Sequence, residues 1–224
     1  MDSRCGQGKV IRMRVEDDRI SSLPDDLIHK ILSFVGLKLA VQTSALSSRW
    51  RYIWTSLPYL NFSSKDFSTL PKFTNFVKHF ISGRNNLLEV SSVKLTFHGK
   101  VSQLFVRRIL DYAFTHNVQK LTVRSLDDQD DLHVSLFSCQ SLKSLSLYRL
   151  KPAPTWDLPS LTTLYLDDVT FFGDEGIGHI SKCANLKNLT LHRCRLERSY
   201  GVTVGFNIHL PELSNLTLED GCLF

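Results

Sequence analysis

The hydrophobic positions of the chain change their period, and this change divides the chain into two unlike parts. Between residues 23 and 54, apolar side chains recur every three or four positions, as on one face of an α-helix. From about residue 90 to 220 they form short runs that alternate with polar side chains, as in half-buried β-strands. The pattern predicts a mixed α/β chain in which a small helical unit precedes a series of strands.

The helical part begins at Ser22, Pro24 and Asp25, which together form a helix-start signal. Ser22 can accept a backbone N–H, Pro24 needs no donor in the first turn, and Asp25 suits the positive end of a helix. We expect the first helix to end at Gly36. Its apolar residues cover a broad face and are Leu27, Ile28, Ile31, Leu32, Phe34 and Val35.

A second helix is predicted from about residue 39 to 50, and a short third turn from 52 to 54. Three short helices bury little surface, so a unit of this size is marginally stable alone. Its apolar face is wider than its own core needs, which predicts that the rest of the chain or another protein covers it.

The strand-like part carries an LxxLxL pattern whose central residues are Leu95, Leu121, Leu145, Leu164, Leu189 and Leu216. Their spacing is typical of leucine-rich repeats, which recur about every 20 to 29 residues. Residues 186–196 match the longer LxxLxLxxCxL form, whereas the other copies depart from it, so the repeats are irregular. We predict a leucine-rich-repeat solenoid with a parallel, concave sheet. Two helical stripes fit its outer face, one from Leu70 to Gly83 and one from Val101 to Ala113.

Composition narrows the class of protein. The hydrophobic fraction of 42% is ordinary for a globular chain, and no run approaches the roughly 18 apolar residues of a membrane span. The net charge is +5, but its excess is dispersed and partly lies in residues 1–17, so we predict a disordered basic N-terminus and no nucleic-acid partner. Five cysteines without a CxxC pair predict reduced thiols, hence the nucleus or cytoplasm.

No catalytic or metal-binding constellation emerges. The acidic run Asp127–Asp131 lacks the glycine and glutamate of a calcium loop, and His192 with Cys194 lacks a second zinc-spaced pair. No nucleophile motif or phosphate-binding loop is present. We therefore expect neither an enzyme nor a cofactor.

Residues 23–58, LPDDLIHKILSFVGLKLAVQTSALSSRWRYIWTSLP, resemble the F-box, and the TSxLSxRWRxxWxxLP tail resembles the plant F-box/leucine-rich-repeat family. The resemblance implies a three-helix F-box over residues 18–58 that docks on a Skp-type adaptor, and a solenoid over 59–224 that binds a protein substrate. The chain would then be the substrate-recognition subunit of an SCF-type cullin–RING ubiquitin ligase. The alternative is an interaction protein whose F-box couples weakly or not at all.

By the same resemblance, one of Trp50 and Trp54 holds the helical core, and the other lies near the interface or the next domain. A purely internal role for both rings stays open. The expected adaptor-binding residues are Leu23, Pro24, Leu27, Ile28, Ile31, Leu32, Val35, Leu46, Trp50 and Trp54.

Substrate recognition is expected on outward-facing side chains of the strands, since solenoids commonly use this face. Tyr and Arg are enriched at binding hot spots, and the expected residues are Arg124, Tyr148, Tyr165, Asp167 and His192. A plain solvated sheet face is the competing interpretation. Because plant relatives continue with more repeats and often an FBD region, we expect the solenoid to be incomplete and residues 200–224 to be its least stable part.

Overall fold

The computed structural model describes residues 22–46, 48–127, 133–134, 139–152, 156–172, 180, 182–197 and 209–221. The predicted basic N-terminus and most of the acidic run Asp127–Asp131 lie outside these residues, as do parts of 200–224. The helices are α1 (Asp25–Val35), α2 (Leu37–Gln42), α3 (Leu70–Gly83) and α4 (Gln103–Thr115), with short 3₁₀ helices η1 (Thr43–Ala45), η2 (Ile53–Ser56) and η3 (Ser64–Asp66).

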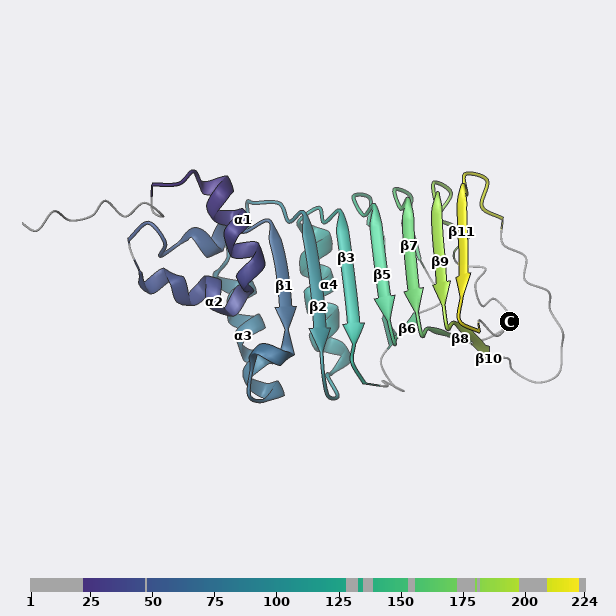
Figure 1. Cartoon of the computed structure of the whole chain (residues 1–224), viewed down its shortest axis with the longest axis horizontal. Helices are drawn as coiled ribbons and strands as arrows, with labels where there is room; N and C mark the ends of the chain where they lie inside the picture. The colour runs from purple at the N-terminus through teal and green to yellow at the C-terminus, as the bar shows by residue number, and fades with distance from the viewer. Residues whose placement is uncertain are drawn as a thin grey trace, which may run out of the picture.

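A parallel sheet dominates the described chain, and its strands follow one another in sequence order (Figure 1). Its seven strands are β1 (Tyr59–Ser63), β2 (Ser92–Phe97), β3 (Lys120–Ser125), β5 (Ser144–Tyr148), β7 (Thr163–Asp167), β9 (Asn188–His192) and β11 (Asn215–Glu219). Two parallel pairs of short strands accompany it: β4 (His133–Val134) with β6 (Lys151–Pro152), and β8 (Thr170–Phe172) with β10 (Arg195–Glu197). The mixed α/β class and the parallel sheet are confirmed.

Helix α1 begins and ends close to the predicted positions. Pro24 rather than Ser22 is its N-cap, because the Pro24 carbonyl accepts hydrogen bonds from the Leu27 and Ile28 N–H groups at 3.0 and 3.1 Å. Gly36 ends the helix as predicted, with φ 81° and ψ 154°. Only glycine adopts such angles at little cost, so Gly36 can turn the chain directly into α2.

The second predicted helix is too long and the third is not α-helical. The α-helix α2 ends at Gln42, the chain continues as η1, and the turn at residues 52–54 becomes the 3₁₀ helix η2. Thr43 explains the early end, because its hydroxyl donates to the Ala40 carbonyl at 2.6 Å. Side chains of this kind compete with backbone hydrogen bonds.

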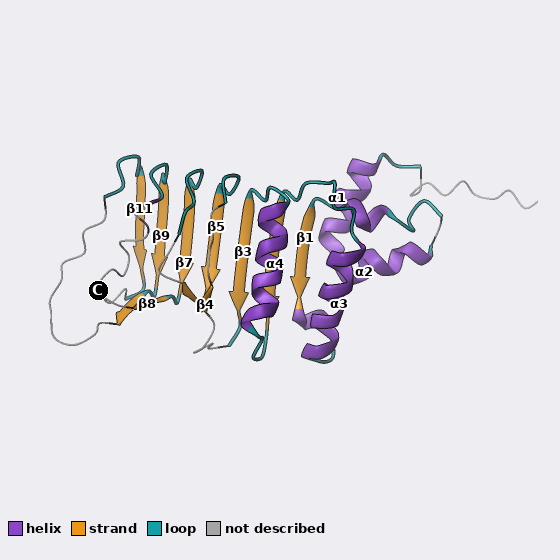
Figure 2. Ribbon diagram, turned by 180° about the vertical axis from the view of Figure 1, so that it is seen from behind, coloured by secondary structure: helices purple, strands orange, loops and turns teal. Residues whose placement is uncertain are grey.

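Helices α3 and α4 lie together on one face of the sheet, over its β1–β3 end (Figure 2). The predicted α3 stripe is confirmed, with Phe73, Val77 and Phe80 buried. In α4 the predicted stripe is partly wrong, since Leu104 is 77% exposed while Val106 and Leu110 are buried. The opposite face of the sheet carries the alternate side chains of the strands, and we call it the open face.

The strand register matches the sequence pattern for all copies but the first. Leu145 pairs with Leu164 and Leu164 with Leu189, as the spacing predicts. At β2, however, Val93 rather than Leu95 pairs with Leu121, so the predicted alignment there is wrong by two residues. Strand β1 was not predicted at all; it pairs with β2 and adds Leu60 and Phe62 to the core.

A left-handed residue follows each of four strands. These non-glycine residues have φ between 47° and 55° and are Arg149 after β5, Asp168 after β7, Arg193 after β9 and Asp220 after β11. The N–H of Arg149 donates to the Asp167 carbonyl at 2.9 Å, and that of Asp168 to the His192 carbonyl at 2.8 Å. The carboxyl ends of neighbouring strands are thereby joined beyond the ladder itself.

One continuous hydrophobic core runs from Ile28 in α1 to Cys194 after β9. Trp54 and Arg84 are among the residues that join the helical unit to the rest of the described chain. Trp54 packs against Phe80 of α3 with ring centroids 5.2 Å apart. Arg84, which is 4% exposed, donates to the carbonyls of Leu57 and Glu89. Burial lowers the pKa of Arg84, so this cation depends on those carbonyls for its solvation.

Candidate functional site

Helix α1 carries exposed apolar side chains directly beside its buried ones. Ile28 and Leu32 are buried in the core, whereas Phe34 is 76% exposed. Successive helical residues are about 100° apart, so positions three and four apart share a stripe. The exposed stripe, which we call the α1 apolar face, consists of Leu27, Ile31, Phe34 and Val35. The described part of the chain leaves this face uncovered.

The predicted adaptor-binding residues therefore separate into two sets. Ile28, Leu32 and Trp50 are buried within the chain, while Pro24 and Leu46 are exposed and Leu23 is partly buried. Phe34 belongs to the exposed set although it was left out of the prediction. Its place three residues after Ile31 was the signal that could have included it.

Arg49 brings the segment before Trp50 to the start of α1. One of its guanidinium nitrogens donates to the Leu23 carbonyl at 2.5 Å and lies 2.6 Å from the Asp25 carboxylate. Asp25 is well exposed, so this ion pair contributes mainly by orientation and little to stability. The contact thereby holds the segment around Arg49 against the start of α1.

The two tryptophans take different positions. Trp50 is 5% exposed and belongs to the helical core. Trp54 lies at the junction with the sheet, against Phe80, and its indole N–H donates to the Arg51 carbonyl at 3.1 Å. Trp50 is therefore buried too deeply to stack with a nucleic-acid base.

On the open face, the structure brings all five predicted recognition residues onto adjacent strands. The Arg124 Cζ lies 3.8 Å from the centroid of the Tyr148 ring, and that ring lies 5.2 Å from the ring of Tyr165. Tyr148 is directly paired with Asp167, and Asp167 with His192. We call these five residues the recognition strip: Arg124, Tyr148, Tyr165, Asp167 and His192.

The far end of the recognition strip is a network of hydrogen-bonded charges. His192 lies between two carboxylates, with Nδ1 2.7 Å from Asp167 and Nε2 2.9 Å from Asp220. Arg193 donates to the same Asp167 oxygen at 2.7 Å. Asp220 and Arg193 were not predicted, because they occupy the left-handed positions after the strands, where period-two alternation no longer assigns a face.

The network shifts the ionisation of its members in opposite directions. Hydrogen bonds to Asp220 and then Asp167 raise the pKa of His192. Burial opposes the ionised form of Asp167, but hydrogen bonds from Arg193 and His192 outweigh it and lower its pKa. Burial, with the neighbouring Asp167 charge, raises the pKa of the Tyr165 hydroxyl. The strip thus presents a cation-supported ring at one end and a paired carboxylate at the other.

The cysteines among the described residues lie in buried positions that suit packing rather than catalysis. Cys139, Cys183 and Cys194 are free and buried. Burial raises the pKa of the Cys183 thiol to about 11, which disfavours the nucleophilic thiolate. Cys194 lies in the turn after β9, as the repeat pattern predicted. Its thiol is 3.6 Å from the carbonyl oxygen of Leu166 on the neighbouring strand β7. Within the described ranges no group of three or more metal-ligating side chains comes together.

No helix among the described residues has the length and apolar character needed to cross a membrane. Comparison with known proteins identifies an F-box domain over residues 20–62. An F-box/FBD/LRR-repeat protein of Arabidopsis thaliana is 35% identical over 92% of this chain and 48% of its own length. An FBD-associated F-box protein of the same plant is 34% identical over 92% of this chain and 49% of its own.

A second FBD-associated F-box protein of Arabidopsis thaliana is 30% identical, over 91% of this chain and 56% of its own length. The chain thus spans about half the length of the curated relatives it matches. No solved structure matches it. The chain therefore carries an F-box domain, and over most of its length it is homologous to F-box/FBD/LRR-repeat proteins of Arabidopsis.

Proposed function

We propose that this chain is the substrate-recognition subunit of an SCF-type cullin–RING ubiquitin ligase. In this proposal the F-box, bounded near residue 58, binds a Skp-type adaptor, and the remainder is a leucine-rich-repeat solenoid that holds a protein substrate. The chain itself catalyses nothing. It raises the effective concentration of a substrate lysine near the ubiquitin thioester. Such a role belongs to the nucleus or cytoplasm, where these ligases act.

The α1 apolar face is the observation that carries the proposal. Leu27, Ile31 and Phe34 stand exposed on a helix that lies inside the matched F-box domain. Contiguous exposed apolar surface of this kind marks a protein interaction site. Pro24 and Leu46 extend the exposed surface toward the start of α1, where Arg49 holds the second segment.

The predicted adaptor-binding residues have two different roles in this proposal, because some are buried in this chain and others are exposed. Ile28, Leu32 and Trp50 support the contact from beneath, because they are buried in this chain and fix the position of α1. The adaptor then meets the exposed set, and Trp54 fixes the helical unit against α3. A rigid junction matters for a ligase, since the substrate must be held at a defined distance from the adaptor.

Calorimetric titration of the purified chain with a recombinant Skp-type adaptor tests this proposal. Leu27→Asp should weaken binding about tenfold or more, because it would place a charge in a desolvated contact. Replacing Leu23 and Pro24 by Ala should weaken it by a smaller factor. The matched control is Leu104→Asp, which changes an exposed leucine on α4 in the same way and should leave binding unaltered.

A folded wild-type chain that binds no adaptor would refute the ligase role and favour an interaction protein with a non-coupling F-box. Equal losses for Leu27→Asp and Leu104→Asp would refute the assignment of the α1 apolar face. Far-ultraviolet circular dichroism of each variant shows whether a loss reflects unfolding.

A further inference from the structure

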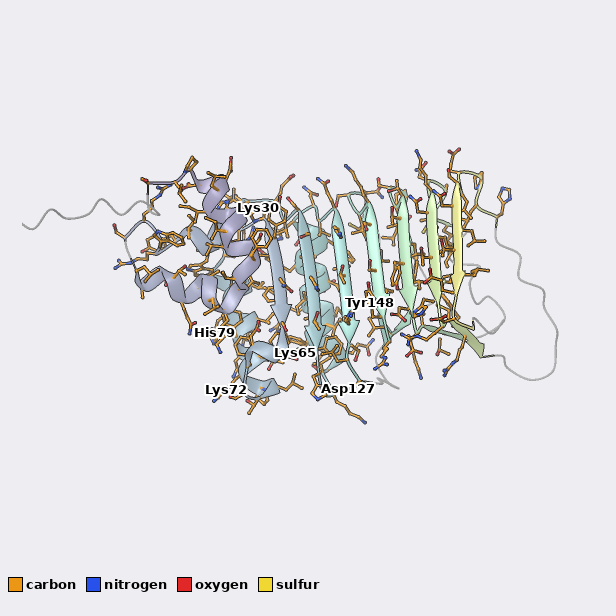
Figure 3. All side chains as sticks on the ribbon, viewed as in Figure 1. Lys30, Lys65, Lys72, His79, Asp127 and Tyr148 are labelled. Atoms are coloured by element: carbon orange, nitrogen blue, oxygen red, sulfur yellow. The ribbon has the colours of Figure 1, made fainter. Side chains whose placement is uncertain are left out.

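A groove of about 440 Å³ lies between α1 and the first strands on the open face. Figure 3 shows Lys30 on α1 and Tyr148 on β5 at its two sides. Its lining combines residues from α1, β1, β2, β3 and β5: Lys30, Ser33, Tyr59, Leu60, Asn61, Ser92, Val93, Lys94, Lys120, Thr122, Arg124, Ser146 and Tyr148. Among the described residues, three lysines and one arginine line the groove, and no carboxylate does.

The cations reach the groove from separate elements. On β3, Lys120 and Arg124 point to the same face four residues apart, which corresponds to about 13 Å along the strand. Lys94 on the neighbouring strand pairs with Thr122, so it stands between these two along the strand direction. Lys30 approaches from the helix side. This spread is invisible in the sequence, where residues 30, 94, 120 and 124 form no cluster.

The two central lysines are not neutralised. Within the described chain, Lys94 and Lys120 are exposed and take part in no ion pair, unlike Arg149 and Arg193 on the same sheet. Like charges held together on one surface attract an anion to the space between them. The groove is therefore electrostatically complementary to an acidic ligand.

Arg124 is already positioned for such a ligand. Its guanidinium lies over the Tyr148 ring with Cζ 3.8 Å from the centroid, and its buried Nε atom has no hydrogen-bond partner among the described residues. A stacked guanidinium loses less conformational freedom when a carboxylate binds, and its planar edge suits two parallel hydrogen bonds.

We propose that this groove binds an acidic segment of a protein in extended conformation. The inference deepens the proposed function, on which it rests, by naming the chemical class of the substrate segment. An extended peptide advances about 3.3 Å per residue, so acidic side chains four residues apart match Lys120 and Arg124. An acidic side chain midway between them faces Lys94. Tyr59, whose ring is exposed, flanks this path and can cover the peptide backbone.

A nucleic acid fits the groove less well. The Tyr148 ring already stacks with Arg124 and lies beside Tyr165, so it offers no open platform to a base. Asp167 on β7 is the strand partner of Tyr148, and its pKa is lowered, so it carries a negative charge. This charge would repel the phosphates of a nucleic acid that extended beyond Tyr148. A peptide can place a neutral or basic residue at that point.

Fluorescence anisotropy with the full purified chain tests the proposal. The probes are a labelled peptide of alternating Glu and Ser, the same peptide with Gln for Glu, and a single-stranded RNA of similar length. Lys94→Gln combined with Lys120→Gln removes two charges from the groove. Lys65→Gln combined with Lys72→Gln removes two charges outside it, toward the other end of the strands from Lys30 (Figure 3).

The Glu peptide should bind at least about tenfold more tightly than the Gln peptide, with affinity that falls as salt rises. The groove variant should lose about tenfold, and the control variant less than twofold. Equal binding of the two peptides, or an equal loss in both variants, would overturn the proposal. Tighter binding of the RNA through the same lysines would overturn it in favour of nucleic acid.

The adaptor titration separates this test from that of the ligase role. Adaptor binding without Glu-peptide binding overturns the groove and leaves the ligase proposal standing. Glu-peptide binding without adaptor binding supports the groove and refutes the ligase role. Circular dichroism of every variant confirms folding, and a single Lys120→Gln variant, expected to lose less than the double variant, serves if the double variant unfolds.

Discussion

The guanidinium of Arg124 lies over the ring of Tyr148, 3.8 Å from the ring centroid, so a side chain of β3 and one of β5 form a single unit on the open face. A cation over an aromatic ring gains about 0.5 to 2 kcal/mol, depending on its exposure. Each partner holds the other in one orientation. Losing either should therefore impair the same surface.

We predict that Tyr148→Ala combined with Arg124→Ala lowers substrate capture by about tenfold or more, since Tyr and Arg supply typical hot-spot energy. Adaptor binding should be unchanged, because the α1 apolar face has none of these residues. The measurement is quantitative mass spectrometry of co-purifying proteins. Thr163→Ala combined with Asn188→Ala, a polar pair on the same face, is the control and should keep full capture. Unchanged capture in the Tyr148 and Arg124 variant would mean that the strip is only a solvated surface.

Arg84 should be a stability determinant of the junction between the helical unit and the sheet. Replacing it with Met leaves the buried carbonyl of Leu57 and the part-buried carbonyl of Glu89 without this donor, which should lower the free energy of unfolding by about 1 to 3 kcal/mol. Urea denaturation measures the loss. Arg107→Met, which removes an exposed ion pair within α4, should cost less than about 1 kcal/mol. Equal costs would show that the Arg84 contacts contribute no more than a surface pair.

The His192 network should make stability depend on pH in a defined window. The raised pKa of His192 stabilises the fold fully below its unfolded value of about 6.5, and this contribution is lost as pH rises through the folded pKa. The lowered pKa of Asp167 acts oppositely, with a contribution that is lost as pH falls below about 4. Both contributions coincide between about pH 4 and 6.5.

Urea denaturation of wild type and His192→Asn tests this window. The stability difference should be larger at pH 5.5 than at pH 8.5. In a background of Asp167→Asn and Asp220→Asn, the same substitution should show little pH dependence, because the carboxylates that hold the proton are absent. A difference that grows above pH 7 would contradict the assignment.

Leu189 and Leu216 occupy paired positions on neighbouring strands but differ in burial. Leu189 is 1% exposed and Leu216 is 55% exposed. Leu189→Ala should cost about 2 to 5 kcal/mol of unfolding free energy, whereas Leu216→Ala should cost about 1 kcal/mol or less. The amides of β11 should also exchange with deuterium faster than those of β5 and β7. Similar costs and similar protection would show that β11 is covered in solution.

The sequence predicts most of the sheet because Leu145, Leu147 and their counterparts alternate strictly with polar residues. That alternation also placed Arg124 beside Tyr148 and Asp167 beside His192. The alignment failed at β2, where Val93, Leu95 and Phe97 are all apolar, so either of two pairings satisfies the pattern.

Other features lay beyond local patterns. Strand β1 directly follows the F-box motif and has only Leu60 and Phe62 as inward residues, too few to establish a period. The groove combines Lys30, Lys94 and Lys120, which are distant in sequence and meet only through strand order. Helix α2 ended early because side-chain hydrogen bonding by Thr43 outweighed the helical period.

The left-handed residues after β5, β7, β9 and β11 have a consequence for how uniquely this sheet can form. Sliding one strand past its neighbour by two residues would keep every leucine facing inward, so hydrophobic burial alone tolerates such a slip. The left-handed residues do not tolerate it. The N–H groups of Arg149, Asp168 and Arg193 each reach one carbonyl of the next strand, and the Asp220 carboxylate pairs with His192 of the preceding strand. These positions act as stops that define where each strand must end. Strand β2 has no such non-glycine stop, and it is the strand whose partner the hydrophobic pattern misassigned by two residues.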